Sequence, residues 1–135
     1  MSRFKLAAAM AVMLSAAACS KSTATSPTTT PAANVTDTFT GTLTRNGATN
    51  FQFSVSAAGF VYATLSSVAD SSTVVGLSLG TWNGTSCAVV LANDQAAQGT
   101  TVTGSVTGIG TLCARVYDVG KVVDPLDYQV TVVHP

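Results

Sequence analysis

The three cysteines carry the most reactive side chains of this chain, one near its start and two far along it. Cys19 follows a basic and then apolar leader, whereas Cys87 and Cys113 lie 26 positions apart in the second half. A thiol can take up a lipid group, join another thiol or bind a soft metal ion. Because no third or fourth soft ligand lies near Cys87 and Cys113, we expect no metal site there.

The first 18 residues have the three-part arrangement of an export signal. Arg3 and Lys5 make a basic start, an apolar stretch follows, and small residues lead into Cys19. The apolar and small residues 6–18 number 13, whereas a membrane-spanning helix needs about 20. We therefore expect residues 1–18 to be a cleaved signal peptide rather than a permanent membrane helix.

This leader resembles a bacterial lipoprotein signal, in which small residues stand immediately before a cysteine and a leucine stands upstream. The resemblance implies that Cys19 receives a diacylglycerol, that the leader is cut before it and that the new amine is acylated. Two or three acyl chains of this kind would hold the protein firmly in a membrane, since each buried methylene contributes about 0.8 kcal/mol. The family's usual leucine three residues before the cysteine is here Ala16, with Leu14 further upstream. The alternative is ordinary cleavage after residues 16–18, which would leave a soluble protein beginning at Cys19.

We expect the folded part to lie outside the cytoplasm, on a spacer that would hold it away from the lipid surface. Ser20 and Lys21 lack the aspartate that, by the same resemblance, retains lipoproteins in an inner membrane. We expect a location in a bacterial cell envelope, with the outer membrane favoured. Residues 19–35 are rich in Ser, Thr and Pro, which predicts a disordered, lipid-anchored linker. Residues 36–135 are long enough for one folded domain, which we expect to be monomeric.

If Cys19 is acylated, Cys87 and Cys113 are the only thiols left in an oxidising compartment. Pairing is then the expected outcome. A disulfide between them would close a loop of about 26 residues and stabilise the fold by about 3–4 kcal/mol in the chain-entropy picture. The alternative is two separate buried thiols.

Composition excludes several functions. After loss of the signal, four basic side chains remain beside six aspartates without forming a basic patch, so we expect no nucleic-acid binding. There is no glutamate, and the only histidine, His134, stands next to last, where we expect the chain to fray. Acyl transfer needs a nucleophile, a base and a group that orients the base. We therefore expect no enzymatic activity and no cofactor.

Most of the aspartates fall in or beside predicted turns, where capping the backbone is their usual role. These are Asp70, Asp94, Asp118, Asp124 and Asp127. Three of them gather within residues 118–127, but their spacing matches no calcium-binding loop. We expect solvated turn residues rather than a metal site.

Alternation of apolar and polar residues predicts strands from residue 38 onward, with no helix between them. The clearest strand is 51–55, and Asn-Gly pairs at 46–47 and 83–84 predict tight turns. About eight strands at even spacing favour an all-β fold, an antiparallel β-sandwich or jelly roll.

Three further segments are interpreted from pattern alone. Residues 87–91 form a nearly continuous apolar run, which predicts a short strand, and residues 93–99 are polar, which predicts a connection. Gly104, Gly108 and Gly110 precede no helix, so we interpret them as bends rather than as a nucleotide-binding loop.

Three aromatic residues are the candidate ligand-binding side chains. Trp82 is the only tryptophan and stands beside a predicted turn, where it could stack on a sugar or an apolar partner with help from Tyr62 or Tyr117. The alternative is that Trp82 packs over the open end of the sandwich.

Three strand-like motifs resemble the bacterial pre-peptidase C-terminal domain, a secreted β-sandwich often attached to proteases. They are residues 59–65, 110–117 and 126–132, and with their spacing they cover most of residues 38–133. The family commonly has an acidic Asp-x-Asp-Leu stretch in its centre, which is replaced here by the apolar residues 74–79. The resemblance therefore implies a β-sandwich fold. It does not imply calcium binding or an accessory role to an attached protease.

Together these observations predict a non-enzymatic, envelope-anchored lipoprotein that displays a β-sandwich for binding a polysaccharide or a protein partner. The alternative is a structural envelope lipoprotein without a dedicated ligand. An exposed Trp82 beside a concave surface would favour binding, and a buried Trp82 without one would favour the structural role.

Overall fold

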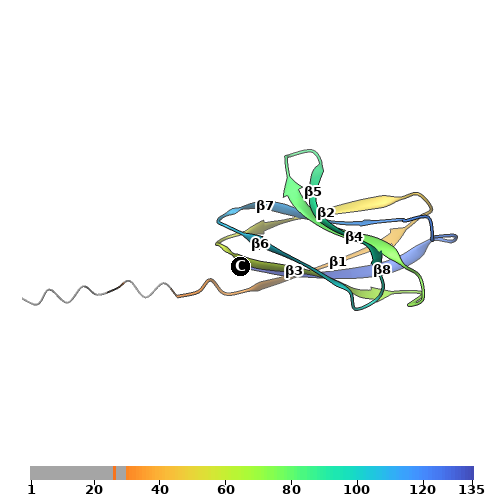
Figure 1. The fold of residues 1–135 in the computed structure, drawn as a ribbon, viewed down its shortest axis with the longest axis horizontal. Helices are drawn as coiled ribbons and strands as arrows, with labels where there is room; N and C mark the ends of the chain where they lie inside the picture. Colours follow the sequence, from red (N-terminus) through yellow and green to blue (C-terminus); the bar gives the residue numbers. More distant parts are fainter. Residues whose placement is uncertain (1–25, 27–29) are drawn as a thin grey trace, which may run out of the picture.

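The computed structural model describes Ser26 and residues 30–135, which form two packed antiparallel sheets (Figure 1). The predicted all-β sandwich is thus confirmed, whereas the predicted signal peptide, residues 1–18, and Cys19 lie outside the described residues. Within the described part, no helix is long and apolar enough to span a membrane. The strands are β1 (Val35–Leu43), β2 (Ala48–Val55), β3 (Gly59–Val68), β4 (Val75–Trp82), β5 (Cys87–Ala96), β6 (Thr101–Val106), β7 (Gly110–Tyr117) and β8 (Leu126–His134).

The two sheets have four strands each. One has the order β1-β8-β3-β6 and the other the order β2-β7-β4-β5. Consecutive strands mostly cross from one sheet to the other, so neighbours within a sheet come from distant parts of the chain. Strands β1 and β2 lie at one lateral edge of the sandwich, and β5 and β6 lie at the other.

The core lies between the sheets and follows the alternation of the strands. Inward positions of β3 and β8 hold fully buried aliphatic side chains, such as Leu65 and Val130, while intervening residues face outward. Leu77 of β4 is also fully buried. Such alternation gives each sheet one apolar face, which the other sheet covers.

The strand register gives the sandwich two different ends. At the first end, called the entry end, β1 begins at Val35 opposite His134, and the connections 56–58 and 107–109 lie close by. At the other end, called the far end, lie the connections 44–47, 69–74, 97–100 and 118–125. Figure 1 shows β1 beginning at the same end as the C-terminus.

Two predictions about element boundaries were wrong. Strand β5 does not end in a polar connection after residue 92 but continues to Ala96. Gly104 and Gly110 are not in bends: Gly104 lies inside β6 between Val102 and Val106, and Gly110 is the first residue of β7. A polar segment can stay extended in β5 because it is an edge strand, where both faces of much of the strand are exposed.

The expectation that the chain frays at His134 was also wrong. His134 is the last residue of β8, is 3% exposed and packs its ring 5.0 Å from that of Phe53. Its Nε2 lies 3.1 Å from Oδ2 of Asp37 on the neighbouring strand β1. The histidine therefore helps to close the entry end.

Candidate interaction groove

The two lateral edges of the sandwich are closed in different ways. At the β1–β2 edge, the rings of Phe39 and Phe51 stack at 4.9 Å, and Tyr128 packs edge-on against Phe51 at 6.2 Å. At the β5–β6 edge, aliphatic side chains leave an open groove of about 160 Å³ between the sheets. Of the two lateral edges, the β5–β6 edge is therefore the one that we consider as a binding surface.

The groove exists because an inward position of β6 has no side chain. Gly104 lies between the inward residues Val102 and Val106, and a Cβ at this position would lie 3.3 Å from Cδ1 of Leu91 and 3.6 Å from Cδ1 of Leu79. The remaining lining comes from β3, β4, β5, β6 and β7, namely Val61, Gly80, Thr81, Val90, Ser105, Val106 and Leu112. Every side chain around the groove is uncharged.

Strand β5 supplies the exposed rim of the groove. Val89, Val90 and Leu91 are 44%, 69% and 40% exposed, although they form the most apolar part of the strand. The β4–β5 register shifts between Leu79 and Gly80, so Val90 has no partner residue on β4. Such a bulge re-aims side chains at a sheet edge. The apolar run 87–91 is therefore an exposed rim rather than a buried strand.

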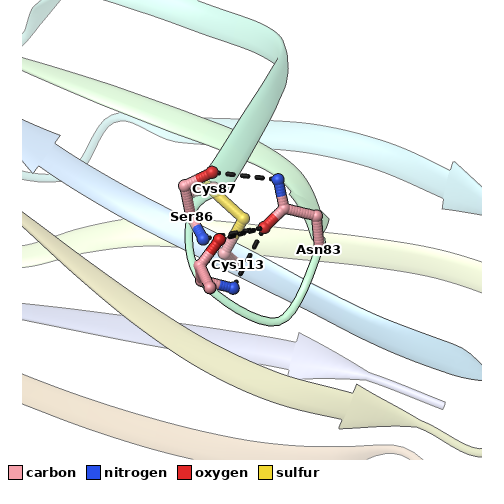
Figure 2. Close-up of a disulfide and its surroundings, with 5 residues drawn as sticks. Asn83, Ser86, Cys87 and Cys113 are labelled. Atoms are coloured by element: carbon pink, nitrogen blue, oxygen red, sulfur yellow. Dashed lines mark hydrogen bonds between the residues drawn. A yellow bond between two sulfur atoms is a disulfide. The ribbon is translucent and has the colours of Figure 1, made fainter.

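The predicted disulfide between Cys87 and Cys113 is confirmed, with an S–S distance of 2.04 Å. It joins β5 to β7, the two strands that flank β4. Figure 2 shows it beside the β4–β5 turn, in which the Asn83 side-chain oxygen accepts a 2.8 Å hydrogen bond from the backbone N–H of Ser86. The positive φ of Gly84, 100°, completes this predicted turn. The hairpin tip beside the groove is thus fixed to the sheet.

The three candidate aromatic residues do not meet on one surface. Trp82 is half-buried at the last position of β4, opposite Cys87. Tyr117 pairs with Gly76, at the other end of β4. Tyr62 lies on β3 in the other sheet, is 38% exposed and contacts Phe60. No shared stacking platform is formed by these three side chains.

Tyr117 makes local contacts on the outer face of its sheet. Its ring lies against Gly76, the guanidinium carbon of Arg115 lies 5.4 Å from the ring centroid, and its hydroxyl donates a hydrogen bond to Asp94. Burial, followed by the hydrogen bond to Asp94, raises the pKa of Tyr117 to about 12. These contacts explain its position without a ligand.

Asp70 and Asp118 organise loops of the far end, as predicted, whereas Asp94 and Asp127 lie within strands β5 and β8 and accept hydrogen bonds from the side chains of Tyr117 and Thr42. Oδ1 of Asp118 accepts hydrogen bonds from the backbone N–H groups of Gly120, Lys121 and Val122 at 2.8–3.0 Å, and Oδ2 accepts one from Asn46 at 2.9 Å. These bonds, led by the one from Asn46, lower the pKa of Asp118 to about 2. Hydrogen bonds from Ser72 and Thr73 lower the pKa of Asp70. Among the described residues, no group of three or more His, Cys or Asp side chains is arranged to hold a metal ion.

The Asp118 contacts predict a specific acid response. The lowered pKa means that the ionised carboxylate stabilises the folded state above about pH 4, and that this contribution is lost as the pH falls toward about 2. Asp118→Asn should therefore make the thermal midpoint less sensitive to pH between about 4 and 2. The pKa of Asp70 is also lowered in the folded state, so part of the pH dependence of the thermal midpoint should remain in the Asp118→Asn variant. Thermal unfolding from about pH 2 to 6 measures this.

Asp124→Asn is the matched control, because it removes a charge from the same loop without touching a hydrogen bond found in residues 30–135. Parallel pH curves for the wild type and Asp118→Asn would contradict the expected role of Asp118.

Sequence reasoning missed the groove, although one signal was present. The alternation Val102, Gly104, Val106 places a glycine where the pattern calls for an inward apolar side chain. The strand that faces this gap is β5, which belongs to the other sheet and is not paired with β6. No pattern in the sequence indicates that these two strands lie close together. No protein-family model matches the chain, and a search of curated proteins finds no match.

Proposed function

We propose that this chain is a non-enzymatic, lipid-anchored interaction module of a bacterial envelope. Its partner would be a protein that offers an extended, uncharged segment with one large apolar side chain. That side chain enters the groove over Gly104. Anchoring through Cys19 follows from the lipoprotein-like leader, and the mass of the mature N-terminus tests it.

The observation that carries the proposal is the apolar groove itself. Its volume of about 160 Å³ is close to that of an apolar cavity that binds a benzene-sized group, on the order of 150 Å³. One Phe or Leu side chain is therefore the right size. Because no charged residue lines the groove, a charged segment would lose its hydration there without compensation.

The neighbouring strand edge offers main-chain hydrogen bonds for the same partner. Within the part of the chain that the structure describes, strand β6 pairs with β3 alone and keeps a regular register from Thr101 to Val106, so its other edge is free to pair. Adding a strand to an exposed edge gives affinity through the main chain and specificity through alternate side chains. The bulge at Val90 makes β5 the less suitable of the two edges.

A protein partner is favoured over a polysaccharide by the placement of the aromatic side chains. The three candidate rings, Trp82, Tyr62 and Tyr117, lie apart and cannot stack together on one sugar. A structural envelope role without a ligand is the alternative, and the open groove favours binding over it. The resemblance of residues 59–65, 110–117 and 126–132 to the pre-peptidase C-terminal domain fits a secreted binding module.

The absence of an enzymatic role belongs to the same proposal. His134 is buried and faces Asp37, so it has no open surface on which to act as a base toward a substrate. The Asp118 carboxylate is occupied by backbone N–H groups. Neither group lines the groove.

Partial filling of the groove tests the proposal. Gly104→Ala should weaken binding of uncharged, extended peptides by about tenfold, the equivalent of about 1.4 kcal/mol, since the added methyl takes space from the incoming side chain. The probe is a displayed library of uncharged peptides, and affinities of the selected sequences are measured by titration. The selected peptides should share one Phe, Leu or Met residue, flanked by residues that favour an extended strand.

Gly108→Ala is the matched control, because a Cβ at this turn position meets nothing within 4 Å. It should leave binding unchanged. Equal binding by wild type and Gly104→Ala would remove the groove from the proposal. Binding on a glycan array that survives Gly104→Ala would instead support the polysaccharide alternative, and self-association lost with Gly104→Ala would make a second copy the occupant.

A further inference from the structure

We propose that the entry end of the sandwich lies against the lipid surface and inserts Phe60 and Ile109 among the headgroups. This inference rests on the proposed anchoring through Cys19. The occupant is a phospholipid surface, and it is inferred from exposed apolar side chains, the distribution of charge and the place where the chain enters the fold.

Two of the most exposed apolar side chains lie at the entry end. Ile109 is 82% exposed in the connection 107–109, and Phe60 is 61% exposed at the second position of β3. The pairing of Gly59 with Val106 brings β3 and this connection together. Tyr62 follows, with its ring 6.3 Å from that of Phe60. Aromatic and apolar side chains of this kind sit well at a membrane–water interface.

The charges of the described residues are distributed unequally between the two ends. At the entry end, the ionisable side chains are Asp37 and His134, which face each other at 3.1 Å. The far end and the strand positions next to it hold the acidic residues Asp70, Asp94, Asp118, Asp124 and Asp127, with the basic residues Arg45 and Lys121. With one exposed carboxylate, that of Asp37, the entry end loses less hydration against lipid than the far end with its five aspartates. Anionic headgroups would repel the acidic far end.

The position at which the linker joins the domain also favours contact of the entry end with the membrane. Strand β1 begins at Val35, at the entry end, 16 residues after Cys19. A chain of this length reaches at most about 55 Å when fully extended. Anchoring at Cys19 therefore raises the local concentration of lipid at Phe60 and Ile109, and weak insertion of two side chains becomes effective. The groove between β5 and β6 then opens sideways, parallel to the membrane, where a partner can reach it.

Depth-sensitive fluorescence tests this orientation. The protein is the mature lipidated chain in vesicles of phosphatidylethanolamine and phosphatidylglycerol with brominated acyl chains. In a Trp82→Phe background, Phe60→Trp and Ile109→Trp should show blue-shifted emission that the bromine atoms quench. Val123→Trp is the matched control, because Val123 is 77% exposed at the far end, and its emission should be neither shifted nor quenched.

A second measurement needs no substitution in the domain. Hydrogen exchange of the wild-type domain should slow in residues 107–109 when the lipidated protein is in vesicles, compared with the soluble Cys19→Ser chain. Flotation with the vesicles and the mass of the mature N-terminus report on the anchor separately. A chain without acyl groups overturns the proposed anchoring. An anchored chain in which the Phe60→Trp and Ile109→Trp variants are unquenched and exchange is unchanged overturns the orientation alone, and so does a cross-link through Phe60→Cys to a second copy.

Discussion

Removing the Cys87–Cys113 disulfide should lower the free energy of unfolding by about 3.5 kcal/mol, the loop-closure value for residues 26 apart. The bond restricts the unfolded chain, and in the folded state it holds the β4–β5 hairpin tip to β7. A single domain is stabilised by only about 5–15 kcal/mol in total. The loss should therefore be a large fraction of the stability.

The variant to compare is Cys87→Ala/Cys113→Ala, because alanine leaves no hydroxyl at the fully buried Cys113 site. Urea unfolding of the variant, of the oxidised wild type and of the reduced wild type gives the three free energies. The variant and the reduced wild type should agree with each other. Equal unfolding midpoints for the oxidised and disulfide-free proteins would contradict a stabilising role for this bond.

Hydrogen exchange locates the effect within the fold. Without the disulfide, backbone amides of residues 82–88 should exchange faster, while Leu65 and Val130 in the centre of the other sheet keep their protection relative to global unfolding. Uniform acceleration would mean that the bond acts only through the unfolded chain.

The fold class was predictable because most strands show alternation that follows burial. In β2, Phe53 and Val55 are buried while Gln52 and Ser54 are exposed, as the sequence pattern indicated. His134 could have been found in the same way, because it continues the inward series of Tyr128, Val130 and Val132. Its position next to last in the chain led to the expectation of fraying, although the inward pattern continues to it.

Strand order was not predictable, and the candidate site depends on it. The apolar run 87–91 predicted a strand but not its place in the sheet: β5 is an edge strand, and Val90 is exposed. Likewise, the groove forms only because β5 and β6 lie at the same edge of the sandwich, in different sheets. Trp82 and Tyr117 are separated because Trp82 ends β4, whereas Tyr117 pairs with Gly76 near the beginning of β4. These are long-range pairings, which local sequence does not encode.

The glycine at position 80 should be among the most sensitive residues of the domain. A Cβ on Gly80 would lie 2.7 Å from the carbonyl carbon of Ala88 and 2.9 Å from Cα of Val89. These are backbone atoms of β5 at its bulge, so no side-chain rotation relieves the contact. Gly80→Ala should therefore destabilise the fold by about 3 kcal/mol, the upper part of the usual range for overpacking.

Gly110→Ala is the matched control for Gly80→Ala, because a Cβ at position 110 in β7 meets nothing within 4 Å. Its unfolding midpoint in urea should stay close to that of the wild type. If the two alanine variants unfold at the same urea concentration, the close approach of β5 to Gly80 is not a requirement of the fold.

A double-mutant cycle separates local strain at Gly80 from the restraint by the disulfide. Both features hold the same hairpin tip against the sheet, so the disulfide prevents the tip from moving away from an added methyl group. Gly80→Ala should therefore cost less in the Cys87→Ala/Cys113→Ala background than in the wild type, with a coupling energy of about 1 kcal/mol. Additive effects would show that β5 near Ala88 is held by its pairing with β4, whether or not the sulfur atoms are joined.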